Sequence, residues 1–217
     1  MLTLSTARSE DWEMVAEGTK AALVRVGLQI VEERGVDALT LREIGTQAGV
    51  SRQTPYRHFE NKEMLLAAIA AEGMRRERGW MTRALDGGVG SPESRVHAIA
   101  EAHVRLLTQH RFLYELVYGG AVAKSATPEL QQEAIASFAL LREAVQACFP
   151  EISDLLVLRL RCIVLWGAVR GIAELEMRSQ VPGSVGGGVK DWVGEAVSTL
   201  LAGWKKGSRT PARRATR

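Results

Sequence analysis

Basic, amide and hydroxyl side chains gather between residues 51 and 62, and their types suit the recognition of nucleic acid. Arg52 and Gln53 follow a Gly-Val-Ser turn, and arginine and glutamine are the side chains that pair with guanine and adenine edges in a DNA major groove. Short hydroxyl and imidazole groups of the same stretch can bond phosphate oxygens. A lysine at the start of a helix can meet a phosphate together with the backbone N–H groups. The candidate contact residues are Arg52, Gln53, Thr54, Tyr56, His58 and Lys62.

The charge of this stretch is opposite to that of most of the chain. Residues 40–62 carry four basic and two acidic side chains, which is a local net charge of +2. The full chain has 28 basic and 25 acidic residues, but residues 205–217 alone hold six basic and no acidic ones. Without that segment, 22 basic residues face 25 acidic ones, a net charge of −3. We therefore expect residues 205–217 to be a basic, disordered tail.

Two short helices joined by a glycine turn must position these side chains. Thr40 can cap the first helix, and Glu43 three residues later completes a capping box. Ser51 can cap the second helix after the turn. A longer helix on each side braces the pair, which makes the arrangement a helix-turn-helix. The expected helices are 10–34, 40–48, 52–59 and 61–85.

The same pattern fits an ordinary helical hairpin with a solvated polar face, because helix-turn-helix spacing is a weak signal by itself. The second helix is too polar and too short to be stabilised by its own burial, which favours a partner outside the chain. Two hypotheses therefore stay open at this point: a DNA-binding regulator, and a helical protein-interaction scaffold without specific DNA binding.

Helical periodicity continues to residue 204, so we expect an all-α fold of about nine helices. No pair of strand-like runs flanks an Asn-Gly or Asp-Gly turn. Ser91-Pro92 and Thr127-Pro128 each place a capping residue before a proline, which is typical of a helix start. The expected helices of this half are 91–110, 111–118, 127–149, 153–177 and 189–204.

Composition excludes several classes of protein. Hydrophobic residues are 46% and charged residues 24% of the 217, which excludes wholesale disorder. The longest run without a charged residue, 179–189, is far shorter than the roughly 20 residues of a bilayer helix. The N-terminus has no apolar signal core, so we expect a cytoplasmic protein with no membrane partner. Cys148 and Cys162 show no pairing pattern and are expected to be buried free thiols.

The sequence offers little support for catalysis or for a metal. No nucleophile–base motif is visible, so we expect neither an enzyme nor a cofactor. The glycine-rich run 183–190 lacks the Gly-Lys-Ser/Thr order of a phosphate loop. His97 and Glu101 share a helix face, but no second cluster with metal-ligand spacing accompanies them, and we expect no metal.

Residues 35–66, GVDALTLREIGTQAGVSRQTPYRHFENKEMLL, resemble the DNA-binding domain of TetR-type transcriptional regulators. The shared pattern is T-x-R-E-I-x-x-x-A-G-V-S-x-x-x-x-Y-x-H-F-x-x-K-E-x-L-L, and about 50 residues are covered when 19–34 are included. The resemblance implies a dimeric repressor whose third helix enters the major groove. By this resemblance the base-facing positions are Arg42, Arg52, Gln53 and Tyr56. The phosphate-facing ones are Thr40, Thr54, Tyr56, His58 and Lys62.

One position departs from the commonest form of this pattern. Pro55 stands where an aliphatic residue is usual, and the expected helix makes it the fourth helical residue. There it removes one backbone donor close to the N-terminus, where donors are mostly unpaired.

A second, weaker resemblance covers the C-terminal half. Residues 99–118 and 163–177 resemble the WHG-type regulatory domain, in which a tryptophan is followed by His-Gly four residues later. Trp166 and Gly171 match this signature, but Arg170 stands where histidine is usual.

Together these features predict a helix-turn-helix domain over 1–62 and a C-terminal domain over 63–204 that dimerises and binds a small hydrophobic effector. The expected homodimer is a repressor that the effector releases from a palindromic operator. A pocket between helices needs apolar and aromatic walls with a few polar groups. The candidate pocket residues are His103, Phe112, Trp166 and Arg170. Arg170 is expected to meet an anionic group of the ligand or an internal carboxylate, Glu115 or Glu174.

Overall fold

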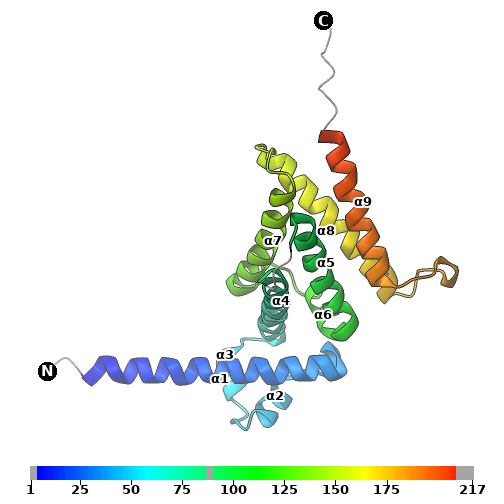
Figure 1. Ribbon diagram of the computed structural model, residues 1–217. Helices are drawn as coiled ribbons and strands as arrows, with labels where there is room; N and C mark the ends of the chain where they lie inside the picture. Colours follow the sequence, from blue (N-terminus) through cyan, green and yellow to red (C-terminus); the bar gives the residue numbers. More distant parts are fainter. Residues whose placement is uncertain (1–3, 87–89, 209–217) are drawn as a thin grey trace, which may run out of the picture. The chain divides into compact units, whose positions relative to one another are not determined.

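The computed structural model describes residues 4–86 and 90–208, and within them every regular element is a helix (Figure 1). The predicted all-α fold is confirmed. The α-helices of the described residues are α1 (Leu4–Arg34), α2 (Leu41–Gln47), α3 (Thr54–His58), α4 (Lys62–Asp86), α5 (Pro92–Gln109), α6 (Arg111–Tyr118), α7 (Pro128–Cys148), α8 (Leu155–Met177) and α9 (Val189–Ser208). Two 3-10 turns, η1 (Val36–Ala38) and η2 (Gly183–Val185), stand between them.

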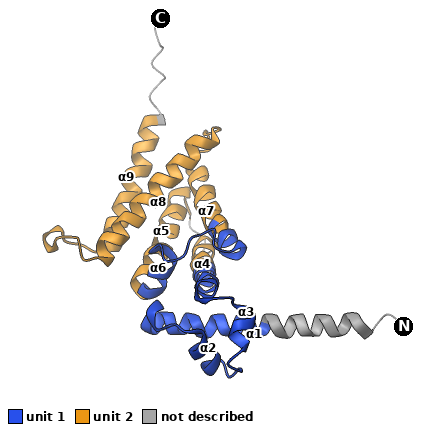
Figure 2. Ribbon diagram, turned by 180° about the vertical axis from the view of Figure 1, so that it is seen from behind, with its two compact units in different colours: residues 1–76, 110–134 blue, residues 77–109, 135–217 orange. Residues whose placement is uncertain are grey.

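The chain divides into two compact units that interleave along the sequence (Figure 2). The first unit combines residues 1–76 with 110–134, and the second combines 77–109 with 135–217. Helices α4 and α7 each contribute residues to both. This division follows packing and differs from the boundary expected at residue 62, so the domain limits 1–62 and 63–204 stay a prediction.

In the first unit, α1 packs against α2, α3 and α6. Buried aliphatic side chains of α1, α2 and α4 form its core, and Gly27 lets α1 approach α4 closely. A Cβ at Gly27 would lie 2.7 Å from the Cδ1 atom of Ile69. Gly35 ends α1 with φ at +80°, and the ring of Phe112 covers it. The fully buried aliphatic residues of this core include Leu23, Leu28, Ile30, Val31, Leu39, Ile44, Leu65 and Ile69.

In the second unit, α5, α8 and α9 pack against one another. Only one stripe of α8 is buried, including Leu158, Cys162 and Leu165. The opposite stripe leaves large apolar side chains exposed: Leu155, Leu156, Val157, Leu160, Ile163, Val164, Trp166 and Leu175. A helix that is apolar on both faces has a second surface that is not covered within this chain.

Local capping explains most helix starts. The Oγ1 atom of Thr40 accepts from the Glu43 N–H at 3.2 Å, and the Asn61 side chain accepts from the Met64 N–H at 2.9 Å. Ser91 and Thr127 cap α5 and α7 as expected. Helix α8 is an exception, because Asp154 caps it through the Leu156 N–H rather than Ser153.

Several helix limits differ from the predicted ones by one to six residues, among them the starts of α1 and α3 and the end of α9. Helix α1 begins at Leu4, earlier than residue 10, and α3 begins at Thr54, later than residue 52. Helix α9 continues past Trp204 to Ser208, so the first four residues of the expected tail are helical. An ion pair between Lys205 and Glu93 accompanies this extension. The rest of the predicted disordered tail, 209–217, lies outside the described residues.

Candidate nucleic-acid interface

The turn between α2 and α3 is tight and closed by backbone hydrogen bonds. The Val50 N–H donates to the Gly45 carbonyl at 3.0 Å, and the Thr54 N–H donates to the Ser51 carbonyl at 3.0 Å. Gly49 adopts φ of +68°, a conformation that glycine reaches without strain. The turn therefore fixes the direction in which α3 leaves α2.

Pro55 sets how closely the two helices pack. It is buried, and the rest of α3 offers no other fully buried side chain. A Cβ at Gly45 would lie 2.9 Å from the Cγ atom of Pro55, so the proline ring rests directly on a glycine of α2. The expected position of Pro55 as the fourth helical residue is wrong, because α3 begins at Thr54 and Pro55 is its second residue. Proline is well suited to this first turn, where its missing N–H costs nothing.

The predicted base-facing residues are exposed together. Arg42 lies in the first turn of α2, and Tyr56, with 57% of its surface exposed, lies on α3. Arg52 and Gln53 occupy the turn before α3 rather than its first helical turn, since Ser51 does not begin the helix. The Ser51 hydroxyl instead lies 2.8 Å from the Thr54 hydroxyl.

The predicted phosphate-facing residues border this surface. Thr40 caps α2, Thr54 begins α3, and Lys62 is the first residue of α4. His58, at the end of α3, is half-buried. The structure thus places the eight predicted residues on three successive helices and in the segments that precede them.

The four cationic side chains of this surface are not neutralised by carboxylates of the described residues. Within the described part of the chain, Arg42, Arg52, Arg57 and Lys62 form no ion pair. Glu43 is neutralised, because Arg34 at the end of α1 pairs with its carboxylate. The Glu43 side chain therefore joins α2 to α1 instead of closing the second half of the predicted capping box.

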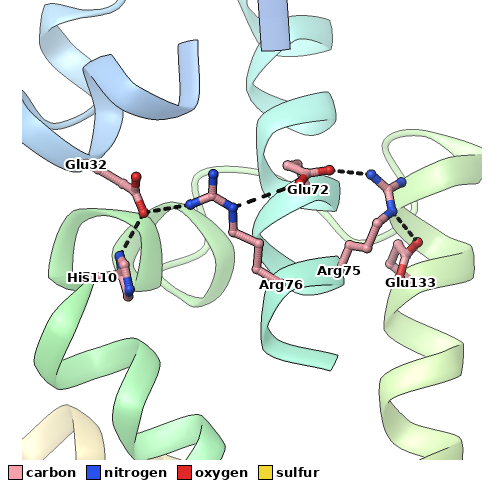
Figure 3. Close-up of polar contacts among 6 residues, drawn as sticks. All are labelled: Glu32, Glu72, Arg75, Arg76, His110 and Glu133. Atoms are coloured by element: carbon pink, nitrogen blue, oxygen red, sulfur yellow. Dashed lines mark hydrogen bonds and ion pairs between the residues drawn. The ribbon is translucent and has the colours of Figure 1, made fainter. Parts of the chain in front are cut away.

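A chain of ion pairs in the first unit was not predicted (Figure 3). Glu32 of α1 accepts from Arg76 of α4 at 3.1 Å, and its carboxylate lies 2.7 Å from the Nδ1 atom of His110, which precedes α6. Arg75 of α4 reaches Glu133 of α7 at 3.1 Å. Glu72 lies beside both arginines. No local sequence signal reveals the contacts between helices, because their partners lie 44 to 78 positions apart.

The four candidate pocket residues are distributed over both units. Phe112 belongs to the first unit, packs on Gly35 and is 42% exposed. His103 belongs to the second unit and is buried, with its Nδ1 atom 2.8 Å from the carboxylate of buried Glu77. Arg170 donates to Glu174, one of the two expected internal partners, at 3.0 Å. Trp166 lies on the exposed stripe of α8.

Two cavities lined by described residues lie elsewhere. One of about 1080 Å³ lies in the first unit between α1 and α4, and one of about 920 Å³ lies in the second unit beside η2 and α9. Neither is lined by a candidate pocket residue. Among the residues described, no group of three potential metal ligands comes together, and no described helix is long and apolar enough to cross a membrane.

Comparison with known proteins covers both halves of the chain. Residues 23–69 match the family described as bacterial regulatory proteins, tetR family, and residues 96–200 match the tetracyclin repressor-like C-terminal domain. The finer WHG resemblance stays a prediction. Tetracycline repressor protein class G of Vibrio anguillarum is 39% identical over 59 residues. That match spans 27% of this chain and only 28% of the relative.

Two solved structures share the fold over most of their length. A protein of unknown function from Rhodococcus sp. RHA1 is 28% identical, with a TM-score of 0.71 over 85% of this chain and 94% of the other. The transcriptional regulator FadR from Bacillus subtilis, solved in complex with stearoyl-CoA, is 17% identical, with a TM-score of 0.64 over 84% and 98%.

Proposed function

Since the chain belongs to the TetR family of bacterial regulatory proteins, whose members are transcription factors rather than enzymes, we propose that it represses transcription by binding a palindromic operator as a homodimer. The observation that carries this proposal is the surface of α2, α3 and the start of α4. There, cations without carboxylate partners among the described residues stand next to exposed amide and phenol groups. Such a surface suits phosphate contacts and base reading together.

Base reading is assigned to Arg52 and Gln53, with Arg42 and Tyr56 beside them. Side chains in a turn that leads into the recognition helix can reach base edges when the N-terminal end of that helix enters the groove. Phosphate contacts are assigned to Thr40, Thr54, His58 and Lys62. Lys62 begins α4, where its charge adds to the unpaired backbone N–H groups of a helix N-terminus.

The dimer is proposed to form through α8 and α9. The exposed stripe of α8 is apolar along most of the helix, and a Cβ at Gly167 or Gly171 would meet nothing within 4 Å. Small residues on an otherwise apolar stripe leave room for a second helix. A symmetric dimer presents two copies of α3, which suits half-sites roughly 10 base pairs apart.

Release is proposed to follow a population shift. A small hydrophobic effector favours a conformation in which the two recognition helices no longer match successive major grooves. FadR, which shares this fold, was solved with stearoyl-CoA, whose acyl chain is apolar, and the effector here is proposed to be hydrophobic. The proposed location of the protein is the cytoplasm, where its operator lies.

Selection of genomic fragments with the full-length protein, followed by gel shifts on the selected site, tests the function. We expect Arg52→Ala to cost about 1–3 kcal/mol on the operator and to relax specificity at one base pair. Lys62→Ala should weaken binding to the operator and to random DNA alike. It should also reduce the slope of log affinity against log salt concentration by about one unit.

Arg178→Ala is the matched control, because Arg178 is exposed beyond the end of α8 and should leave both affinities unchanged. Equal losses for Arg52→Ala on operator and random DNA would remove its base-reading role. Recovery of no enriched fragment at low salt would favour the interaction scaffold instead.

A further inference from the structure

The groove between α1 and α4 has the size and shape of a ligand site. It encloses about 1080 Å³ within the first unit. Residues 18–28 of α1 form one wall, and residues 64–76 of α4 form the other. The segment 58–60 and the start of α7 complete it. Sites for small molecules in proteins commonly measure about 300–1,000 Å³, so the groove can hold a molecule of substantial length.

The lining of the groove is mixed, with small and apolar side chains between the charged groups of its rim. Leu28, Phe59 and Ala71 are each at most 3% exposed. Ala21 and Ala68 stand on opposite walls, and their short side chains leave the space between the helices open. An apolar chain or ring placed here would replace water along both helices, which favours its binding.

The rim of the groove carries a cation that the protein itself does not neutralise. Lys20 pairs with Glu129 at 4.0 Å. Arg75 and Arg76 are held by carboxylates of α1, α4 and α7, as Figure 3 shows. Arg25 lines the groove too, and among the residues described here it has no carboxylate partner.

The acidic side chains of the rim do not cancel this charge. Glu72 and Glu129 are already paired with the neighbouring cations. Glu60 is exposed to solvent, as Arg25 is, so water and salt screen both charges equally. The lining has four cationic side chains, three carboxylates and His58, and two further carboxylates, Glu32 and Glu133, pair with Arg76 and Arg75.

From this geometry we infer that the α1–α4 groove is a binding site for an amphipathic organic anion, whose apolar body lies between Ala21 and Ala68 and whose carboxylate pairs with Arg25. A guanidinium accepts a carboxylate in a bidentate manner, which gives this end of the ligand a fixed orientation. The site lies beside the DNA-binding helices and is distinct from the effector pocket expected in the C-terminal half.

Decanoate tests the inference, with 1-decanol as the uncharged chain of the same length. Binding of each to the full-length protein is measured by calorimetry without DNA, so the result does not depend on the proposed function. Arg25→Gln should weaken the binding of decanoate about ten-fold and leave the affinity for decanol unchanged. Arg83→Gln is the matched control, because Arg83 is an exposed arginine of α4 outside the groove.

Two filling variants locate the site. Ala68→Phe and Ala21→Phe place a ring in the groove from opposite walls, and each should abolish binding of both probes. Ala21 is exposed, so its variant keeps the test available if Ala68→Phe does not fold. Retained binding in a folded filling variant overturns the site, and equal effects of Arg25→Gln and Arg83→Gln overturn the role of Arg25.

A contact to DNA phosphate is the competing use of Arg25. Operator affinity of Arg25→Gln in the absence of decanoate separates the two. Unchanged operator affinity with weakened decanoate binding supports the ligand site. Lowered operator affinity with unchanged decanoate binding overturns it and assigns Arg25 to the DNA interface.

Discussion

Replacing Gly45 by alanine should disturb the recognition helix without disturbing the rest of the fold. The new Cβ would lie 2.9 Å from the Pro55 Cγ atom, whereas carbon atoms in contact prefer about 3.5–4.0 Å. The two atoms must therefore separate by roughly 0.6–1 Å. The proline ring cannot rotate away, so α3 itself has to move relative to α2.

Two opposing terms decide the stability of this variant. Alanine favours a helix over glycine by about 1 kcal/mol, and overpacking a close contact costs about 1–3 kcal/mol. We expect a net loss of up to roughly 2 kcal/mol of unfolding free energy and a fall in operator affinity of ten-fold or more. Gly18→Ala is the matched control, because nothing lies within 4 Å of its added Cβ and only the gain in helix propensity remains.

The assay combines thermal denaturation with gel shifts on the selected operator. A double-mutant cycle with Pro55→Ala isolates the contact, since removal of the ring should restore much of the operator affinity that Gly45→Ala loses. If Gly45→Ala raised stability as much as Gly18→Ala and bound the operator normally, the Gly45–Pro55 contact would not set the position of α3.

Three further predictions follow from the second unit. Leu160→Glu should yield monomers at micromolar concentration in analytical sedimentation. Burial of this half-exposed leucine in both copies of the dimer is worth roughly 2–3 kcal/mol, and the buried glutamate charge adds a further cost. An unchanged dimer would exclude the exposed stripe of α8 as the dimer interface. Burial raises the pKa of Cys148 and Cys162 to about 11, so at pH 8 about one thiol in a thousand is ionised, and native protein should react far more slowly with a thiol reagent than unfolded protein; equal rates would contradict this burial. The hydrogen bond from Lys205 holds the pKa of Glu93 below its usual range. Ionised Glu93 therefore stabilises the folded state above the unfolded-state pKa, and this contribution is lost as the pH falls through the folded-state pKa. Lys205→Met should reduce the loss of unfolding free energy at acid pH, and an unchanged pH dependence would refute the coupling.

Sequence reasoning succeeded where the determinant is local. The starts of α2, α5 and α7 depend on a side chain that caps a backbone N–H three residues ahead, so Thr40, Ser91 and Thr127 identify them directly. The expected DNA-facing residues are likewise assigned from a short pattern. Whether they contact DNA as assigned stays a prediction.

Sequence reasoning failed where a distant partner decides. The expected cap Ser51 failed for a local reason: its hydroxyl lies against that of Thr54, and α3 begins three residues later. Glu43 looks like half of a capping box, but Arg34 occupies its carboxylate. The groove lined by Arg25 depends on the approach of α1 to α4, which no periodicity within either helix reports.

These distant contacts form a continuous connection within the first unit. Pro55 seats α3 on Gly45 of α2, Glu43 joins α2 to the end of α1, and Glu32 joins α1 to Arg76 of α4. The first step is a packed contact and the other two are partly exposed ion pairs, so we expect a displacement of α4 against α1 to reach the recognition helix only as far as these pairs hold. A molecule in the α1–α4 groove would act on this connection at its last step, between Arg76 and Glu32. It would change DNA affinity only as far as its own affinity differs between the DNA-binding arrangement of α1 and α4 and the alternative one.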